Sequence, residues 1–220
     1  MTSELVLATR NRHKLKELAE ILDATGLDVE LLPLPADAPE VAEDGLTFAE
    51  NALKKARSAA ATTGLPSVAD DSGLCVDALN GMPGVFSARW SGQHGDNAAN
   101  LELLLGQLAD VPARHRGARF ACAAALVLPT GEECVVEARL EGVLTDVPRG
   151  RGGFGYDPVF LPQGHDRTTA EMTAADKNAI SHRGNAFRAL VPSIRELLGL
   201  STGFVREGGL EPPRPEGTAP

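Results

Sequence analysis

Residues 68–73, with the sequence VADDSG, form a short apolar run that ends in two adjacent acids. Gly64 and Pro66 interrupt the helical pattern before it, and an apolar segment resumes at residues 74–76, so the run indicates a strand. Open α/β sheets place their chemistry outside the carboxyl ends of strands, and neighbouring strand residues point to opposite faces. Asp70 and Asp71 are therefore expected at a strand end with different roles, one facing a cavity and the other fixing the turn.

Two neighbouring carboxylates repel each other unless a cation or hydrogen-bond donors compensate their charge. A hard divalent metal ion is the commonest such cation for oxygen ligands. The plainer alternative is an Asp-Asp-Ser-Gly turn with solvated side chains. Motifs elsewhere in the chain favour the metal site.

The composition limits the class of protein. The 220 residues, 43% of them hydrophobic and 23% charged, suit one sizeable domain or two small lobes that share a cleft. A net charge of −9 argues against a nucleic-acid-binding surface, which needs a basic face. The three cysteines, Cys75, Cys122 and Cys134, fit neither a disulfide framework nor a zinc site. No signal-peptide pattern or membrane-spanning run is visible, which predicts a cytoplasmic protein without a membrane partner.

The N-terminal segment predicts an anion site. An apolar strand over residues 4–9 precedes helical periodicity over residues 14–24, and the turn between them exposes the first N–H groups of the helix. Arg10 and Lys14 lie in this turn, where cations oppose the helix dipole unless an anion offsets them. The turn has no Walker glycines, and a plain N-capped helix is the alternative.

Elements of both kinds follow in alternation. We expect a strand at residues 28–32, a helix at 47–63 opened by a capping box of Thr47 and Glu50, and a helix capped by Asp96 or Asn97. Residues 118–128 and 133–144 suit a β-hairpin, so the sheet should be mixed. A short strand at 158–161, a helix at 174–180, a break at 181–184 and a closing helix at 185–198 complete a domain over residues 1–200. The Gly- and Pro-rich residues 201–220 are predicted to form a disordered tail.

A glycine-rich loop at residues 149–158 carries Phe154 and Tyr156, although aromatics make up only 4% of the chain. Glycine lets the backbone approach a flat ligand, and an aromatic ring can stack on it. The alternative is a mobile linker, but such linkers rarely carry aromatic residues.

Five motifs occur in order: T-x-N-x-x-K at residues 9–14, E-x-G-x-T-F-x-E-N-A at 43–52, A-D-D-S-G at 69–73, G-G-F-G-Y-D-P at 152–158 and K-N-A-I-S-H-R-G at 177–184. Together they resemble the inosine triphosphatase, or Ham1-like, family of nucleoside triphosphate pyrophosphatases, over roughly residues 4–198. The resemblance implies an α/β fold: a two-lobed sandwich with a long mixed β-sheet and a central nucleotide-binding cleft, usually in a homodimer. It also implies Mg²⁺-dependent hydrolysis of ITP, dITP, XTP or dXTP to the monophosphate and pyrophosphate.

The resemblance assigns roles residue by residue. Asp71 would be the proton acceptor and would hold Mg²⁺ together with Glu43, although an additional acid, Asp44, leaves the choice of ligand in that loop open. Lys177 or Arg183 would donate to O6 of a 6-oxo purine. The substrate-binding residues that it implies are Thr9, Arg10, Asn11, Arg12, His13, Lys14 and Lys55 for the triphosphate, Ser72, the base-pocket residues Phe154, Gly155, Tyr156 and Asp157, and Lys177, His182 and Arg183 closing over the purine.

Two rival functions compete with this interpretation. Maf-like pyrophosphatases share the architecture but act on pyrimidine or modified nucleotides, and the G-G-F-G-Y-D and S-H-R motifs argue against them. A nucleotide- or RNA-binding module without catalysis is the rival from another class. The acidic net charge and the intact pair of aspartates argue against that module.

Overall fold

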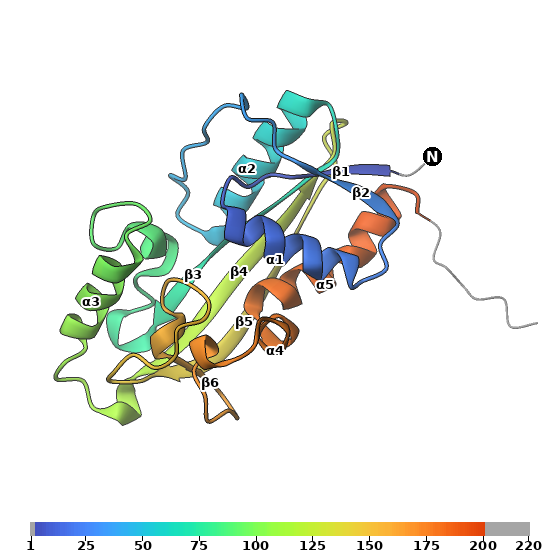
Figure 1. The fold of residues 1–220 in the computed structure, drawn as a ribbon. Helices are drawn as coiled ribbons and strands as arrows, with labels where there is room; N and C mark the ends of the chain where they lie inside the picture. Colours follow the sequence, from blue (N-terminus) through green and yellow to red (C-terminus); the bar gives the residue numbers. More distant parts are fainter. Residues whose placement is uncertain (1–2, 201–220) are drawn as a thin grey trace, which may run out of the picture.

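The computed structural model describes residues 3–200, apart from the side chains of residues 12–14. Its centre is a six-stranded sheet in the order β2-β1-β3-β4-β5-β6 (Figure 1). β1 runs parallel to β2 and β3, whereas the pairs β3–β4, β4–β5 and β5–β6 are antiparallel, so the predicted mixed sheet and α/β class are confirmed. The strands are β1 Ser3–Leu7, β2 Val29–Pro33, β3 Ser67–Val76, β4 Gly117–Val127, β5 Glu133–Leu144 and β6 Phe160–Pro162.

Helices cover both faces of the sheet (Figure 1). The α-helices are α1 Arg12–Asp23, α2 Phe48–Thr63, α3 Asn97–Gln107, α4 Ala174–Ile180 and α5 His182–Leu197. Short 3₁₀ segments are η1 Asp77–Leu79, η2 Gly84–Arg89, η3 Ala113–His115, η4 Asp157–Val159 and η5 Thr169–Glu171. None of the helices in the described part of the chain is long and apolar enough to cross a membrane.

Three apolar clusters make up the core. On one face of the sheet, α1 and α5 pack on β1, β3 and β4 through residues such as Leu18, Phe187 and Val68. On the other face, the alanines of α2 pack closely against β3 and β4. The third cluster lies farther along the long strands, where Leu74 of β3 packs with residues of α3 and β6. β3 contributes to all three clusters. It is therefore shared by two lobes, one that contains α1, α2 and α5 and one that contains α3 and β6.

The acids of β3 do not lie at the end of the strand, which corrects the prediction. β3 continues to Val76 because its residues from Ser67 onward pair antiparallel with β4. The parallel partner β1 pairs only with Ser67 and Val68. Beyond Val68, no described strand pairs with β3 on the side toward β1, and the end of β3 instead contacts the segment around η2 through an isolated bridge from Cys75 to Pro83. Asp70 and Asp71 thus lie within β3 but just past the end of β1, where the cleft opens.

Two helix starts differ from the sequence predictions. Thr47 caps α2 as expected by accepting from the Glu50 N–H at 3.1 Å, but the Glu50 carboxylate accepts from the Leu46 N–H rather than from Thr47. The predicted break at residues 181–184 is wrong. The Ser181 hydroxyl accepts from the Gly184 N–H at 2.9 Å, and this cap places residues 182–184 in the first turn of α5.

Candidate active site

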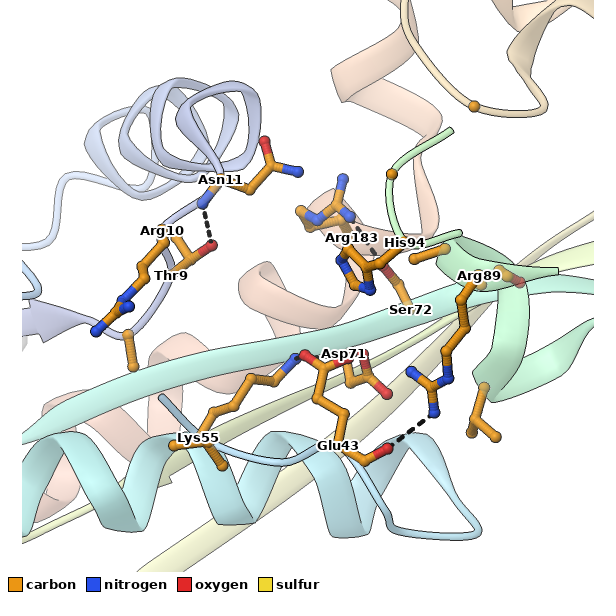
Figure 2. Close-up of a pocket in the computed structure, with 18 of the residues that line it drawn as sticks. Thr9, Arg10, Asn11, Glu43, Lys55, Asp71, Ser72, Arg89, His94 and Arg183 are labelled. Atoms are coloured by element: carbon orange, nitrogen blue, oxygen red, sulfur yellow. Dashed lines mark hydrogen bonds and ion pairs between the residues drawn. The ribbon is translucent and has the colours of Figure 1, made fainter. Parts of the chain in front are cut away.

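A cavity of about 840 Å³ lies between the lobes along the open edge of β3 (Figure 2). This volume is in the range of sites for small molecules. All five sequence motifs contribute to its lining. Of the predicted site residues with described side chains, the cavity is lined by Thr9, Arg10, Asn11, Glu43, Lys55, Asp71, Ser72, Phe154, Gly155, Tyr156, Asp157, Lys177, His182 and Arg183. The predicted contacts of Arg12, His13 and Lys14 involve side chains outside the description.

Asp71 and Glu43 face each other across the ammonium group of Lys55. The Lys55 Nζ lies 3.2 Å from Asp71 Oδ1 and 2.9 Å from Glu43 Oε1 (Figure 2). Burial alone would lower the pKa of Lys55, but the charges of Asp71, Asp70 and Glu43 raise it above its ordinary value. Lys55 therefore stays charged and compensates the two carboxylates. Its side chain is only 14% exposed.

The arrangement of carboxylates suits Mg²⁺. Glu43 and Asp71 come close enough for one cation to contact both, as the Lys55 ammonium does. The described residues contain no group of three or more His, Cys, Asp or Glu side chains that could hold a metal. Mg²⁺ is commonly held by one or two carboxylates together with substrate phosphates, whereas structural zinc needs four protein ligands. Two carboxylates in a cleft therefore fit Mg²⁺.

The structure distinguishes Glu43 from Asp44. Asp44 forms an ion pair with Lys54 on the exposed side of the loop, and this hydrogen bond lowers the pKa of Asp44. Glu43 lines the cavity instead, and its backbone carbonyl accepts from Arg89 Nη2 at 2.9 Å. Of these two acids, Glu43 is therefore the one placed to share a cation with Asp71, as both already share the Lys55 ammonium.

Asp70, on the opposite face of β3, is bound to a buried arginine. The Arg183 Nε donates to Asp70 Oδ2 at 3.1 Å, Nη2 donates to the Ser72 hydroxyl at 2.8 Å, and Nη1 pairs with Glu17 of α1. The Arg183 side chain is only 2% exposed. The network joins α1, β3 and α5, so that the start of α1 is held relative to β3.

The glycine-rich loop and α4 form one wall of the cavity. Lys177 Nζ lies 2.7 Å from Asp157 Oδ2 and 5.0 Å from the centroid of the Phe154 ring. Asp157 is held from its other side by the Thr169 hydroxyl at 2.7 Å. A Cβ at Gly153 would lie 2.0 Å from Asp157 Oδ2, so glycine is required there. The wall presents an aromatic ring beside a fixed ammonium group, which suits a flat ligand with an acceptor at its edge.

Tyr156 and His182 contact protein on their far sides. The Tyr156 hydroxyl donates to the Ser87 carbonyl of η2 at 2.9 Å, and burial raises the pKa of this hydroxyl, which keeps it a donor. Tyr156 therefore connects the glycine-rich loop to η2. The His182 ring stacks on Phe120 of β4 with a centroid distance of 4.9 Å.

The turn after β1 has the expected local structure. The Asn11 N–H donates to the Thr9 hydroxyl at 3.2 Å (Figure 2), and the Leu15 N–H bonds to the Asn11 carbonyl, so α1 begins directly after this turn. Arg10 reaches across the cleft entrance and donates to the Ala38 carbonyl. Thr9, Arg10 and Asn11 all line the cavity, so the N-terminus of α1 lies at its wall.

Sequence reasoning missed four residues around the site. Arg89 and His94 line the cavity from the segment that carries η2 (Figure 2). Glu17 pairs with Arg183, and Asn51 donates to Asp71. Asn51 was visible as a polar residue beside the alanines of the buried α2 face, whereas nothing in the local sequence indicated the partners of the other three.

Comparison with known proteins gives concordant matches. A family model described as the Ham1 family matches residues 5–193. The dITP/XTP pyrophosphatase of Streptomyces coelicolor is 62% identical over 199 residues, which cover 90% of this chain and all of the relative. The protein of the same name from Mycobacteroides abscessus is 55% identical over 201 residues, covering 90% and 97% of the two chains.

Solved structures agree. The nucleoside-triphosphatase, or dITP/XTP pyrophosphatase, of Mycobacterium abscessus superposes with a TM-score of 0.71 at 55% identity, covering 87% of this chain and 100% of the other. A HAM1 protein from Coxiella burnetii gives a TM-score of 0.80 at 41% identity, covering 89% and 100%.

Proposed function

The chain belongs to the Ham1 family, and from this premise we propose that it hydrolyses non-standard purine nucleoside triphosphates, ITP, dITP and XTP, to the monophosphate and pyrophosphate. The observation that carries the proposal is the position of Asp71, Lys55 and Glu43 in the same cavity as Phe154 and Lys177. One cavity thus combines groups suited to phosphate chemistry with groups suited to a base. The Ham1 match disfavours a Maf-like enzyme, and the relatives' names disfavour a module without catalysis.

We propose that Glu43 and Asp71 hold Mg²⁺. When bound, the ion neutralises phosphate oxygens and polarises the phosphorus. Asp71 is suited to orient a water molecule and accept its proton, because it lines the cavity and its Oδ1 is paired with Lys55, a cation on a flexible stem that can exchange one anion for another. Lys55, relieved of the two carboxylates, would pair with the phosphates. The turn from Thr9 to Lys14 would bind the triphosphate through backbone donors.

Base selection is proposed to rest on Lys177. A 6-oxo purine presents an acceptor at O6, which the Lys177 ammonium matches, and Phe154 offers a ring for stacking. The 6-amino group of ATP would place a donor against a donor, and sites built on hydrogen bonds reject such substrates strongly. Arg183 was the other expected O6 donor. Its Nε, Nη1 and Nη2 donate to protein acceptors, so we assign it a positioning role instead.

The deciding experiment measures products from ITP, dITP, XTP and ATP with Mg²⁺ and with EDTA. We expect pyrophosphate and the monophosphate from the first three, little product from ATP, and no product with EDTA. Release of orthophosphate and a diphosphate would contradict the reaction, and equal rates on ATP and ITP would contradict the selectivity.

The homodimer and the cytoplasmic location stay predictions. Light scattering of the purified protein tests the first, because a dimer of the 23.0 kDa chain would have twice that mass. Cell fractionation tests the second.

A further inference from the structure

Asn51 lies in the first turns of α2 with no solvent exposure, and both ends of its amide are used. Its Nδ2 donates to Asp71 Oδ2 at 3.1 Å, and its Oδ1 accepts from the Gly45 N–H at 2.8 Å. The orientation of the amide is unambiguous, because an ionised carboxylate only accepts hydrogen bonds and a backbone N–H only donates them. One buried side chain therefore connects Asp71 of β3 to the loop that carries Glu43 and Asp44.

The connection ends two residues from Glu43. A Cβ at Gly45 would lie 2.6 Å from Asn51 Oδ1, so the loop approaches α2 as closely as a glycine permits. Lys55 follows Asn51 by four residues and lies on the same face of α2. The helix thus reaches the two oxygens of Asp71 separately, with Asn51 on Oδ2 and Lys55 on Oδ1.

We propose that Asn51 is a positioning residue for the divalent-metal site of this pyrophosphatase. By occupying Oδ2 it directs Oδ1 of Asp71 toward the cavity, and by holding Gly45 it fixes Glu43 at the distance from Asp71 that a shared ion requires. The inference rests on the proposed function for its chemistry. Groups that orient metal ligands contribute about 10- to 100-fold to metal affinity or activity.

The test compares Asn51→Leu with Asn100→Leu. Asn100 is a matched control, because it is also buried in a helix, at 1% exposure, and also uses both amide ends: it accepts from the Ser91 N–H and donates to the Ala88 carbonyl. Both substitutions keep the number and branching of side-chain heavy atoms and remove the amide, and both add the same bulk. Gly45→Ala is a milder second variant, because its backbone is not in the left-handed region and the atoms nearest to the new Cβ would be Asn51 Oδ1 at 2.6 Å and Glu50 Cβ at 2.9 Å.

The readout is binding of Mn²⁺, measured by electron paramagnetic resonance without nucleotide, together with the Mg²⁺ concentration that half-activates ITP hydrolysis. We expect Asn51→Leu to lower the Mn²⁺ affinity and to raise the half-activating Mg²⁺ concentration, each by about 10- to 100-fold. Gly45→Ala should change both in the same direction to a smaller degree. Asn100→Leu should lower the melting temperature and leave the Mn²⁺ affinity unchanged. KM for ITP at saturating Mg²⁺ should change much less than the metal affinity.

Normal Mn²⁺ affinity in Asn51→Leu would overturn the inference and leave Asn51 a structural residue. If Asn51→Leu does not fold, normal Mn²⁺ affinity in Gly45→Ala overturns it equally. Failure of the proposed function reads out separately, as absence of pyrophosphate release from ITP by the unmodified protein.

Discussion

Asp70 and Asp71 are neighbours on one strand, but their environments differ. The Asp70 side chain has no solvent exposure and meets Arg183, whose planar guanidinium is itself buried. Asp71 is 9% exposed, lines the cavity and meets the ammonium of Lys55. Both acids are compensated by a cation, as adjacent carboxylates require. The cations differ in whether they can leave.

This difference separates a structural acid from a reactive one. A guanidinium that donates to three groups in a fixed plane cannot rotate away without losing all of them, whereas a lysine on a flexible stem can exchange one anion for another. Asp70 is therefore suited to hold α5 and α1 on the sheet. Asp71 is suited to change partners during a reaction.

The largest effect should come from Asp71→Asn. Removing a general base usually costs about 10²- to 10⁴-fold in rate, and the loss of a metal ligand adds to this. The fold should persist, because an asparagine at this position keeps the volume and its carbonyl can still accept from Asn51. Pyrophosphate release and circular dichroism would be measured together. More than about a tenth of the normal rate would exclude Asp71 as the base.

Asp70→Asn should lower the free energy of unfolding rather than the rate of the reaction, because Asp70 is the structural acid of the two. The substitution leaves the buried charge of Arg183 with Glu17 as its remaining acidic partner, and removing one partner of a buried pair costs about 3–5 kcal/mol. Urea unfolding measures this loss. A stable Asp70→Asn protein with a large loss of kcat would assign Asp70 to the chemistry and merge the two roles.

Lys177→Met tests whether a second acid–lysine pair at the cavity also exchanges partners. A charge-assisted hydrogen bond to O6 is worth about 1.5–3 kcal/mol, so kcat/KM should fall roughly 10- to 150-fold more for ITP than for ATP. Arg183→Ala, by contrast, should lower kcat/KM for ITP and for ATP by the same factor. The opposite pattern would return the O6 contact to Arg183.

The smallest effect is expected for Ser72→Ala. This variant distinguishes a role of Ser72 in the Arg183–Asp70 network from a role in substrate binding. Its hydroxyl accepts from Arg183 and donates to Asp70 at 3.3 Å, so its loss should cost about 1 kcal/mol and lower Tm by about 2–4 °C. Differential scanning calorimetry and the KM for ITP would be compared. A raised KM with an unchanged Tm would place Ser72 with substrate binding.

Much of the fold was predictable because the signals are local. Periodicity predicted α2 and the hairpin of β4 and β5, and the strand pattern predicted that Asp70 and Asp71 face opposite sides. The continuation of β3 past its acids was not predictable, because it depends on pairing with a strand about fifty residues later. The start of α5 was missed because one serine cap decided it.

The same limit applies to the site. The five motifs predicted one shared site, and residues of all five line the same cavity in the structure. The role of Arg183 depends on Glu17, which precedes it by 166 residues, and no local pattern links the two. The burial of Arg183 and its three protein acceptors are why we propose a positioning role for it, and neither could be predicted from the local sequence.

The long strands that both lobes share have a mechanical consequence. β3, β4 and β5 run uninterrupted from the α2 side of the molecule to the α3 side (Figure 1). Most domain closures use a few loop residues as hinges, but here rotation of one lobe would have to twist three hydrogen-bonded strands. The sheet is therefore expected to resist rotation of one lobe against the other. We expect the width of the cleft to change little, so that a triphosphate would enter through rearrangement of the loops at its rim.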